Sequence, residues 1–192
     1  LVEDPTAIGL LGITFSTPPA TWYDDWTDAL GAAPAAAAVI TTPDLAETDV
    51  GDRDLAVEDV ATPSNLTGIG VRSTPYLSEW QEAVVAVESL TMLLQYSDAQ
   101  SVYRFLHVLT SRIRATGATG QFYLDPAMHD AQTVELLKSL FDGVLECERS
   151  TGSGDGEDGS GTDDTDGSGT DDTDGSGDDE DGEGWTARFR GA

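Results

Sequence analysis

The sequence predicts an α/β fold, with a mostly parallel sheet, helices on both faces and an antiparallel β-hairpin at the end. Short continuous apolar runs, typical of strands buried on both faces, alternate with longer segments of helical periodicity. Two segments near the C-terminus instead alternate polar and apolar side chains, as strands with one exposed face do. The 192 residues suffice for one substantial core.

Four apolar runs predict the strands of the parallel sheet. They are Leu10–Ser16, Ala36–Thr42, Ala83–Val87 and Gln121–Leu124. The third run is followed by the polar pair Glu88 and Ser89. The segment between residues 43 and 63 is acidic and lacks a clear period, so we expect irregular structure there.

Four segments with helical signals lie between and after these strands. Three of them are Pro19–Leu30, Asp98–Thr116 and Asp130–Phe141. The fourth, second in chain order, is capped by Ser64 or Asn65 and extends to Trp80, with a break expected near Pro75. The helices Pro19–Leu30 and Asp98–Thr116 are each followed by a glycine, Gly31 and Gly117, and glycine is common just after the last residue of a helix. The helix Asp98–Thr116 has the clearest apolar face, made of Val102, Phe105, Leu106, Leu109 and Ile113.

The hairpin strands, Gly143–Arg149 and Trp185–Arg190, flank an acidic tract at residues 150–184. This tract repeats the unit Gly-Ser-Gly-Thr-Asp-Asp-Thr-Asp and has no apolar residue to bury, so we predict disorder. We interpret it as an insertion in the hairpin turn, within an α/β domain formed by residues 1–149 and 185–192. The alternative is a disordered tail with an aromatic end.

The charge composition is typical of a protein that works in concentrated salt. The formal net charge is −27, and Lys138 is the only lysine. Outside the acidic tract the chain still holds twenty-two acids against nine bases, so the acidity is general. Self-repulsion on this scale is tolerable where salt screens it. The composition therefore indicates a halophilic protein and disfavours nucleic-acid binding.

No apolar run is long enough for a membrane span, and the N-terminus lacks the features of a secretory signal. We therefore expect a cytoplasmic protein that does not enter a membrane. Cys147 is the only cysteine, which excludes an internal disulfide and argues against zinc.

Several segments resemble RecA/KaiC-type ATPases. Ala83-Val-Val-Ala-Val-Glu-Ser-Leu resembles a Walker B strand, and Leu11-Gly-Ile-Thr-Phe-Ser-Thr-Pro-Pro resembles the second core strand of KaiC-like proteins. Arg104-Phe-Leu-His-Val-Leu-Thr, Tyr123-Leu-Asp-Pro and Ser139-Leu-Phe-Asp-Gly resemble a haloarchaeal KaiC-like family of unknown function. The resemblance covers about residues 8–149 and implies a RecA/KaiC-like core. It also implies that Glu88 and Ser89 form a degenerate Walker B site for a nucleotide cofactor.

The departures from that family argue against catalysis. The sequence has no G-x-x-x-x-G-K-[ST] phosphate loop, and the segment before Leu10 is too short for the missing strand, loop and helix. The resemblance places Ser16 and Thr17 where the family has its catalytic glutamates, and hydroxyls are not carboxylate bases. We expect no catalytic residue, no metal site and no cofactor. If a phosphate loop lies upstream of Leu1, the chain is instead part of an ATPase that binds ATP and Mg²⁺.

Basic residues gather on the Asp98–Thr116 helix. Arg104, His107, Arg112 and Arg114 are candidates for binding an acidic partner, the protein's own acidic tract or a nucleotide phosphate. The alternative is a solvated helix face with cations near its C-terminus. We interpret Asp125 as part of a turn and Asp130 as a helix cap, in preference to metal ligands together with His129.

Trp22, Tyr23 and Trp26 suit core packing, or alternatively a partner groove. The sequence thus favours a non-catalytic interaction or regulatory module that binds an unidentified protein or self-associates. A further hypothesis makes the acidic tract the functional part.

Overall fold

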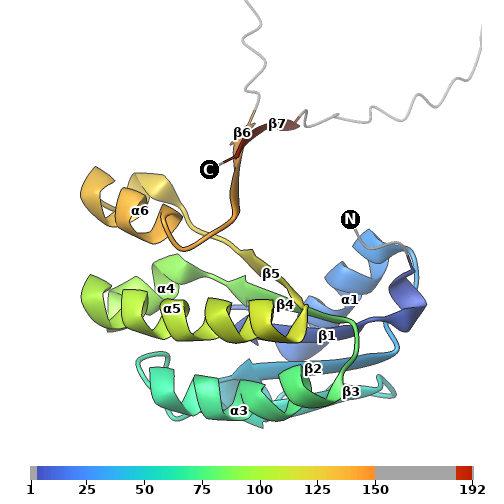
Figure 1. Cartoon of the computed structure of the whole chain (residues 1–192). Coiled ribbons are helices and arrows are strands. Elements are labelled where there is room, and N and C mark those ends of the chain that lie inside the picture. The colour runs from blue at the N-terminus through green and yellow to red at the C-terminus, as the bar shows by residue number, and fades with distance from the viewer. Residues whose placement is uncertain (1–3, 150–184, 192) are drawn as a thin grey trace, which may run out of the picture. The chain divides into compact units, whose positions relative to one another are not determined.

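A computed structural model describes residues 4–149 and 185–191 of the chain (Figure 1). The chain divides into two units, Leu1–Phe141 and Asp142–Ala192, which are described separately. The first unit contains a five-stranded sheet in the order β3-β2-β1-β4-β5, and every neighbouring pair is parallel. The strands are β1 Gly9–Thr14, β2 Ala36–Thr41, β3 Leu55–Asp59, β4 Ala83–Glu88 and β5 Thr119–Phe122. The predicted parallel α/β sheet is confirmed.

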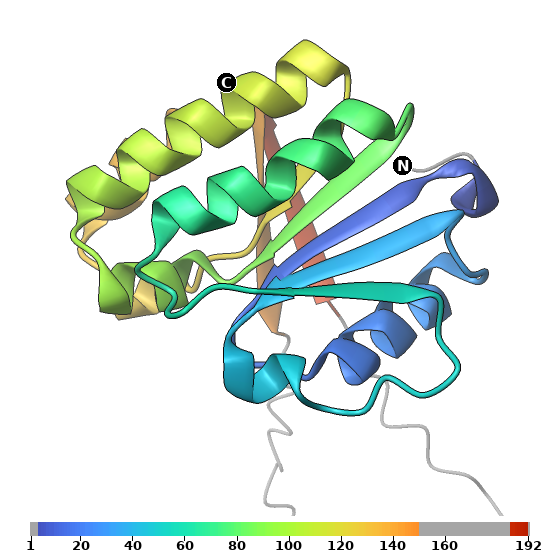
Figure 2. The ribbon, with the colours of Figure 1, turned by 90° about the horizontal axis from the view of Figure 1, so that it is seen from below.

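Helices cover both faces of the sheet, as predicted. They are α1 Pro19–Leu30, α2 Pro43–Ala46, α3 Leu66–Glu79, α4 Leu90–Tyr96, α5 Ala99–Thr116 and α6 Ala131–Lys138, with short 3-10 turns at Pro5–Ala7 and Pro126–Met128. Figure 2 shows α3 and α5 side by side on one face and α1 on the opposite face. The side chains of α4 and α6 also belong to the core on the α3 and α5 face.

Strand β1 shows why the central strands are apolar throughout. Leu11 and Ile13 belong to the larger core, under α3 and α5, whereas Leu10 belongs to the smaller core, under α1. All six residues of the strand are buried. A strand covered on both faces has no position for a polar side chain facing water, which explains the continuous apolar run.

Local sequence signals fix the ends of the long helices. The side chain of Asn65 accepts a hydrogen bond from the backbone N–H of Gly68 and caps α3, and Asp98 caps α5 through Ser101. Gly31 and Gly117 follow α1 and α5 with φ values of 75° and 73°, a backbone conformation that glycine adopts without steric cost. The predicted extents of α1 and α5 are confirmed.

Several elements differ from the prediction. The segment expected to be irregular contains α2 and the edge strand β3, and α4 was not predicted. Strand β5 begins at Thr119, two residues before the predicted start. Helix α3 continues through Pro75, although a break was expected there. Pro75 has no backbone N–H to donate to the carbonyl of Val71, so the helix continues without that one hydrogen bond.

The second unit is the predicted hairpin. Strands β6 Gly143–Arg149 and β7 Trp185–Gly191 pair antiparallel, with Gly143 opposite Gly191 and Arg149 opposite Trp185. They form a two-stranded sheet separate from the parallel one. The acidic tract at residues 150–184 lies outside the described residues, so its disorder stays a prediction.

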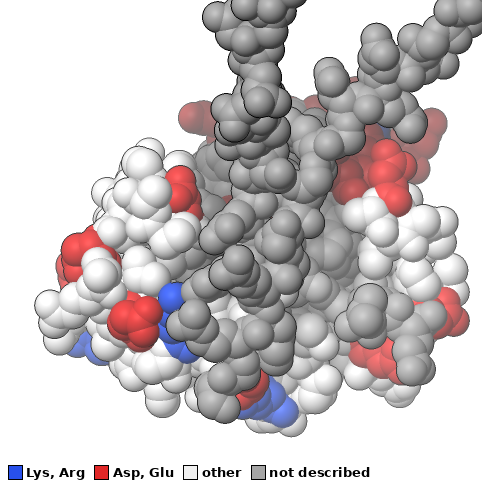
Figure 3. Space-filling model, turned by 90° about the horizontal axis from the view of Figure 1, so that it is seen from above, with Lys and Arg blue, Asp and Glu red and all other residues white. Residues whose placement is uncertain are grey.

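Acidic side chains are spread over the surface. On the face in Figure 3 they lie in several separate places, with fewer basic side chains among them. Arg53 pairs with Asp24 at 2.5 Å, and Arg72 pairs with Glu58. Within the described ranges, no helix has the length and apolar character needed to cross a membrane.

The contact between Gly12 and Trp22 gives a direct test of the packing. A Cβ atom added to Gly12 would lie 2.5 Å from Cζ2 of Trp22, and the indole is only 1% exposed. Gly12→Ala is therefore expected to lower the free energy of unfolding by about 1–3 kcal/mol through overpacking.

Gly70→Ala is the matched control for that substitution. Its new methyl group would meet nothing closer than Phe105 at 3.9 Å, and alanine is the better helix former. We expect this variant to gain about 0.5–1 kcal/mol. Urea denaturation in concentrated KCl measures both changes. Equal stability of the Gly12→Ala variant and the wild type would contradict the packing described.

Candidate functional site

Polar side chains follow one another along the carboxyl edge of the parallel sheet. Thr14 is paired with Glu88, and Thr41 is paired with Asp59. Ile13 is paired with Ile40, so the two threonines also follow each other on neighbouring strands. Both threonines are fully buried. The carboxyl edge of the sheet therefore carries a row of hydroxyl and carboxylate groups, where the strands lead into the connecting loops.

This edge contains a topological switch point between the adjacent strands β1 and β4. The helix that follows β1 lies on one face, whereas α4 and α5, which follow β4, lie on the other. The chain thus leaves the two strands in opposite directions, and this leaves a crevice where open α/β sheets bind their ligands. Glu88 and Ser89, the residues predicted as a degenerate Walker B site, stand at this position.

Glu88 and Ser89 are both engaged by neighbouring groups. The indole Nε1 of Trp26, on α1, donates a hydrogen bond to Oε1 of Glu88 at 3.3 Å. The Ser89 hydroxyl accepts from the backbone N–H of Met92 at 3.2 Å and caps α4. The peptide bond between Glu88 and Ser89 is cis.

Two tryptophans of α1 form the wall beside Glu88. Trp22 lies against Gly12, and its ring centroid is 5.9 Å from that of Trp26, with a tilt of 44° between the rings. The Nε1 donor of Trp22 is buried and has no partner within the described part of the chain. Both tryptophans therefore serve core packing, one of the two roles considered from the sequence. Trp26 also donates a hydrogen bond to the carboxylate of Glu88.

A pocket of about 630 Å³ opens between α1 and the ends of β4 and β5, and we call it the carboxyl-edge pocket. It is lined by Ser16, Trp22, Asp25, Trp26, Ala29, Leu30, Glu88, Ser89, Gln121 and Tyr123. Two of these residues are acidic, three are aromatic, and none is a lysine, arginine or histidine. The pocket is therefore electrostatically suited to cations and unsuited to phosphate groups.

Ser16 and Thr17 follow β1, with Phe15 between them and the last residue of the strand, Thr14. Ser16 is exposed and lines the carboxyl-edge pocket. The backbone N–H of Thr17 donates to Oγ1 of Thr14 at 3.3 Å. In the part of the chain that the structure describes, no group of three or more histidine, cysteine or acidic residues is placed to hold a metal ion.

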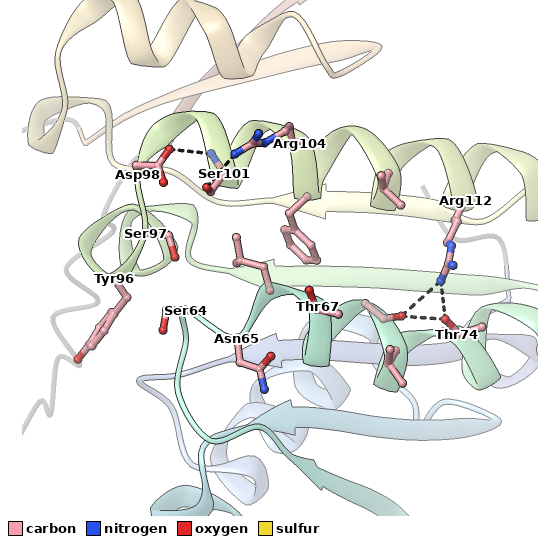
Figure 4. Close-up of a pocket in the computed structure, with 15 residues that line it drawn as sticks. Ser64, Asn65, Thr67, Thr74, Tyr96, Ser97, Asp98, Ser101, Arg104 and Arg112 are labelled. Atoms are coloured by element: carbon pink, nitrogen blue, oxygen red, sulfur yellow. Dashed lines mark hydrogen bonds between the residues drawn. The ribbon is translucent and has the colours of Figure 1, made fainter.

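A second hollow, the α3–α5 groove, lies on the outer side of the two parallel helices (Figure 4). Its volume is about 780 Å³. Its apolar lining includes three strongly exposed side chains, Val71 at 64%, Val108 at 55% and Tyr96 at 54%. Arg104 and Arg112, two of the predicted partner-binding residues, also line it. An apolar surface with adjacent arginines is suited to binding another protein.

The four basic residues predicted as one patch lie in different surroundings. Arg104 donates to the hydroxyl of Ser101 at 3.2 Å, while Arg112 reaches across the groove to Thr74 and the carbonyl of Gly70. These two residues flank the groove, as Figure 4 shows.

The other two lie outside the lining of the groove. His107 stacks on Tyr103 with ring centroids 6.3 Å apart. Arg114 donates to the carbonyl of Leu140 at 2.8 Å and so holds α5 to the segment after α6. Of the four basic residues, only Arg104 and Arg112 therefore line the groove.

Asp125 and Asp130 have the local roles predicted for them. Asp130 caps α6 through the backbone N–H of Thr133, and Asp125 caps the following 3-10 turn through Ala127. By contrast, Asp25, Gln121 and Tyr123 were not expected near a site. They reach the carboxyl-edge pocket from α1 and from the end of β5, and no spacing in the sequence indicates this proximity.

The helix cap beside the groove predicts a specific dependence of stability on pH. The pKa of Asp98 is lowered from 3.8 because its carboxylate accepts hydrogen bonds from the side chain and backbone of Ser101. Since the folded-state pKa is depressed, the stabilisation is complete above pH ~4 and is lost as pH falls through the folded-state pKa.

Asp98→Asn keeps a capping oxygen but does not titrate, so its stability should fall less between pH ~4 and lower pH than that of the wild type. Urea denaturation at several pH values checks this. In Ser101→Ala, NMR titration of Asp98 should give a pKa closer to 3.8. An unchanged Asp98 pKa in that variant would refute the assigned cause.

Comparison with known proteins gives one assignment. No curated protein matches the chain. The model of a family of unknown function, DUF7504, matches residues 3–147, which is well over half of the sequence. The matched region includes the whole parallel sheet and both hollows described above. The protein therefore belongs to the family of unknown function DUF7504.

Proposed function

We propose that this protein is a non-catalytic, RecA/KaiC-like interaction or regulatory module. The proposal is supported by the parallel α/β sheet and by an apolar strand that ends in Glu88 and Ser89, as a Walker B strand ends in an acidic residue and a serine. The acid excess supports work in concentrated salt, in the cytoplasm of a halophile. The module acts through its surface, by binding a protein partner or a second copy of itself.

The charge of the carboxyl-edge pocket carries the non-catalytic part of the proposal. Nucleotide phosphates need backbone N–H groups and a cation, whereas this pocket presents Glu88 and Asp25 with no basic lining residue. Lys138, the only lysine, lies at the end of α6 and pairs with Glu135 at 3.2 Å. Two carboxylates without a cation repel phosphate groups.

The α3–α5 groove carries the interaction part of the proposal. Val71 and Val108 project from neighbouring helices with more than half of their surface exposed. Arg104 and Arg112 stand one helical turn on either side of Val108, so apolar contacts and charge lie close together. The matching partner surface would present apolar side chains beside carboxylates.

The rival function is ATP hydrolysis by a longer protein whose phosphate loop lies upstream of Leu1. The position of Glu88 favours this rival, because a carboxylate at the end of β4 can reach a magnesium ion when phosphates are present. Reading the upstream coding sequence for a strand followed by G-x-x-x-x-G-K-[ST] separates the two functions.

Titration of this chain with Mg-ATP should leave its melting temperature unchanged. A nucleotide that binds the native state would add about 2.7 kcal/mol of stability at a hundredfold excess over its Kd. Thermal unfolding in concentrated KCl measures this, and MgCl₂ alone at equal concentration controls for the ion. A saturable rise in melting temperature that needs ATP would overturn the non-catalytic proposal.

Val108→Asp should remove the bound partner or the self-association. The substitution places a charge on the apolar floor of the groove and one turn from both arginines, so it also occupies the groups that a partner would use. Val108 is 55% exposed, so the isolated fold should tolerate the change.

Met128→Asp is the matched control, since Met128 is 60% exposed and lies outside the groove. Sedimentation velocity and cross-linking of the protein purified from its own cells at native salt measure the association. If Val108→Asp keeps the same associated species as Met128→Asp, the groove is not the binding surface.

A further inference from the structure

We propose that the carboxyl-edge pocket binds a small organic cation that carries a substituted ammonium group. The site lies on the α1 side of the sheet, whereas α3 and α5 and their groove lie on the opposite side (Figure 2). The inference does not depend on the proposed interaction function, because it rests on different residues.

The first argument is the charge of the lining. Glu88 is half-buried at the end of β4, and Asp25 faces the same pocket from α1. No lysine, arginine or histidine is among the lining residues, so nothing in the lining neutralises the two carboxylates. A half-buried carboxylate interacts with an opposite charge more strongly than a fully hydrated one does. The pocket therefore favours a cationic occupant.

The second argument is the aromatic wall, which selects an organic cation over a metal ion. Trp26, which is half-buried, and Tyr123, which is exposed, line the same pocket, and aromatic rings attract ammonium groups through their π faces. Trp26 also holds Glu88 by a hydrogen bond, so the ring and the carboxylate stay side by side.

The pocket offers few protein ligands for a metal ion, because among the described residues no group of three or more histidine, cysteine or acidic side chains is placed to hold one. Oγ of Ser89 caps α4, and Oε1 of Gln121 accepts from the hydroxyl of Tyr123 at 3.2 Å. Magnesium and calcium bind about six or more oxygen atoms, those of water included, and depend on carboxylates that converge on the ion. A substituted ammonium ion needs no such shell, and its methyl groups contact aromatic rings directly.

The third argument is the place and size of the pocket. It opens at the switch point between β1 and β4, where open α/β sheets bind their ligands. Its volume of about 630 Å³ lies within the range of small-molecule sites. Charge, aromatic lining and position thus agree on one class of ligand.

Tetramethylammonium is the probe, and tert-butanol, which has a similar size and no charge, is the control ligand. The chain has four tryptophans, so the indole N–H signals of an NMR spectrum report on the site directly. In concentrated KCl we expect the Trp26 signal to move saturably, with a Kd of roughly 1 mM. Trp80 packs against Gly9 at the opposite end of β1, so its signal should stay unchanged.

Glu88→Gln keeps an oxygen for Trp26 but removes the charge, and it should weaken tetramethylammonium binding about tenfold. Glu82→Gln is the matched control, because Glu82 is exposed and lies at the amino end of the same strand. Asp25→Asn, at an exposed position, provides a second test of the charge and should weaken binding several-fold.

Three outcomes would overturn the proposal. The first is the absence of a saturable shift of the Trp26 signal with tetramethylammonium. The second is an equal shift with tert-butanol, which would show an apolar pocket without cation selectivity. The third is tetramethylammonium binding that Glu88→Gln and Glu82→Gln leave equally intact. If MgCl₂ shifts the Trp26 signal and tetramethylammonium does not, the first outcome also applies, and the carboxylates of the pocket would then be metal ligands.

Discussion

The close packing of the Trp22 indole on Gly12 positions one whole face of this protein. Because residue 12 has no side chain, the Trp22 ring can lie directly against the central strand β1. Helix α1, which carries this ring, therefore packs close to the sheet. Trp26, one turn later, is thereby brought within hydrogen-bonding distance of Glu88 on the neighbouring strand. The tryptophan side of the carboxyl-edge pocket therefore depends on the absence of a side chain at residue 12.

The two faces of the sheet are stabilised in different ways. The larger core, under α3 and α5, has no tryptophan among its buried residues, whereas the smaller core under α1 combines aliphatic and small side chains with the buried Trp22, and Trp26 packs against it. Aliphatic packing leaves few polar atoms to satisfy, while each tryptophan carries an N–H group that needs an acceptor. Glu88 supplies that acceptor for Trp26, so on the α1 face the packing of a tryptophan is coupled to a half-buried carboxylate at the end of β4.

The sequence was sufficient to predict most of the fold, because its strongest signals are local. The apolar runs of β1, β2 and β4 and the long periodic face of α5 are visible without tertiary information. Strand β3 was missed because it is an edge strand in which only Leu55 is fully buried, so its sequence carries a weak pattern. Its strand conformation comes from pairing with β2, which a single segment does not reveal.

The candidate site was predictable only in part, for a related reason. Glu88 and Ser89 stand out because a polar pair ends an apolar strand, and that signal is local. Trp26 is 62 residues from Glu88, and β5 reaches the same pocket from still further along the chain. The four basic residues lie on one helix, α5, but not on one face of it. Arg104 and Arg112 line the groove, whereas His107 stacks on Tyr103 and Arg114 contacts Leu140.

The pairing of Arg149 with Trp185 has a consequence for how the gene can change. The two residues that bound the acidic tract are neighbours across the hairpin, so the segment between them starts and ends at the same place. The tract contains two exact tandem copies of an eight-residue unit, at residues 159–166 and 167–174, and tandem repeats are a kind of sequence that gains or loses whole copies. Each such event would alter the net charge by several units while the hairpin register stayed the same, because loop-closure entropy grows only slowly with length. The tract thus offers a way to adjust acidity in a lineage without remodelling the folded residues.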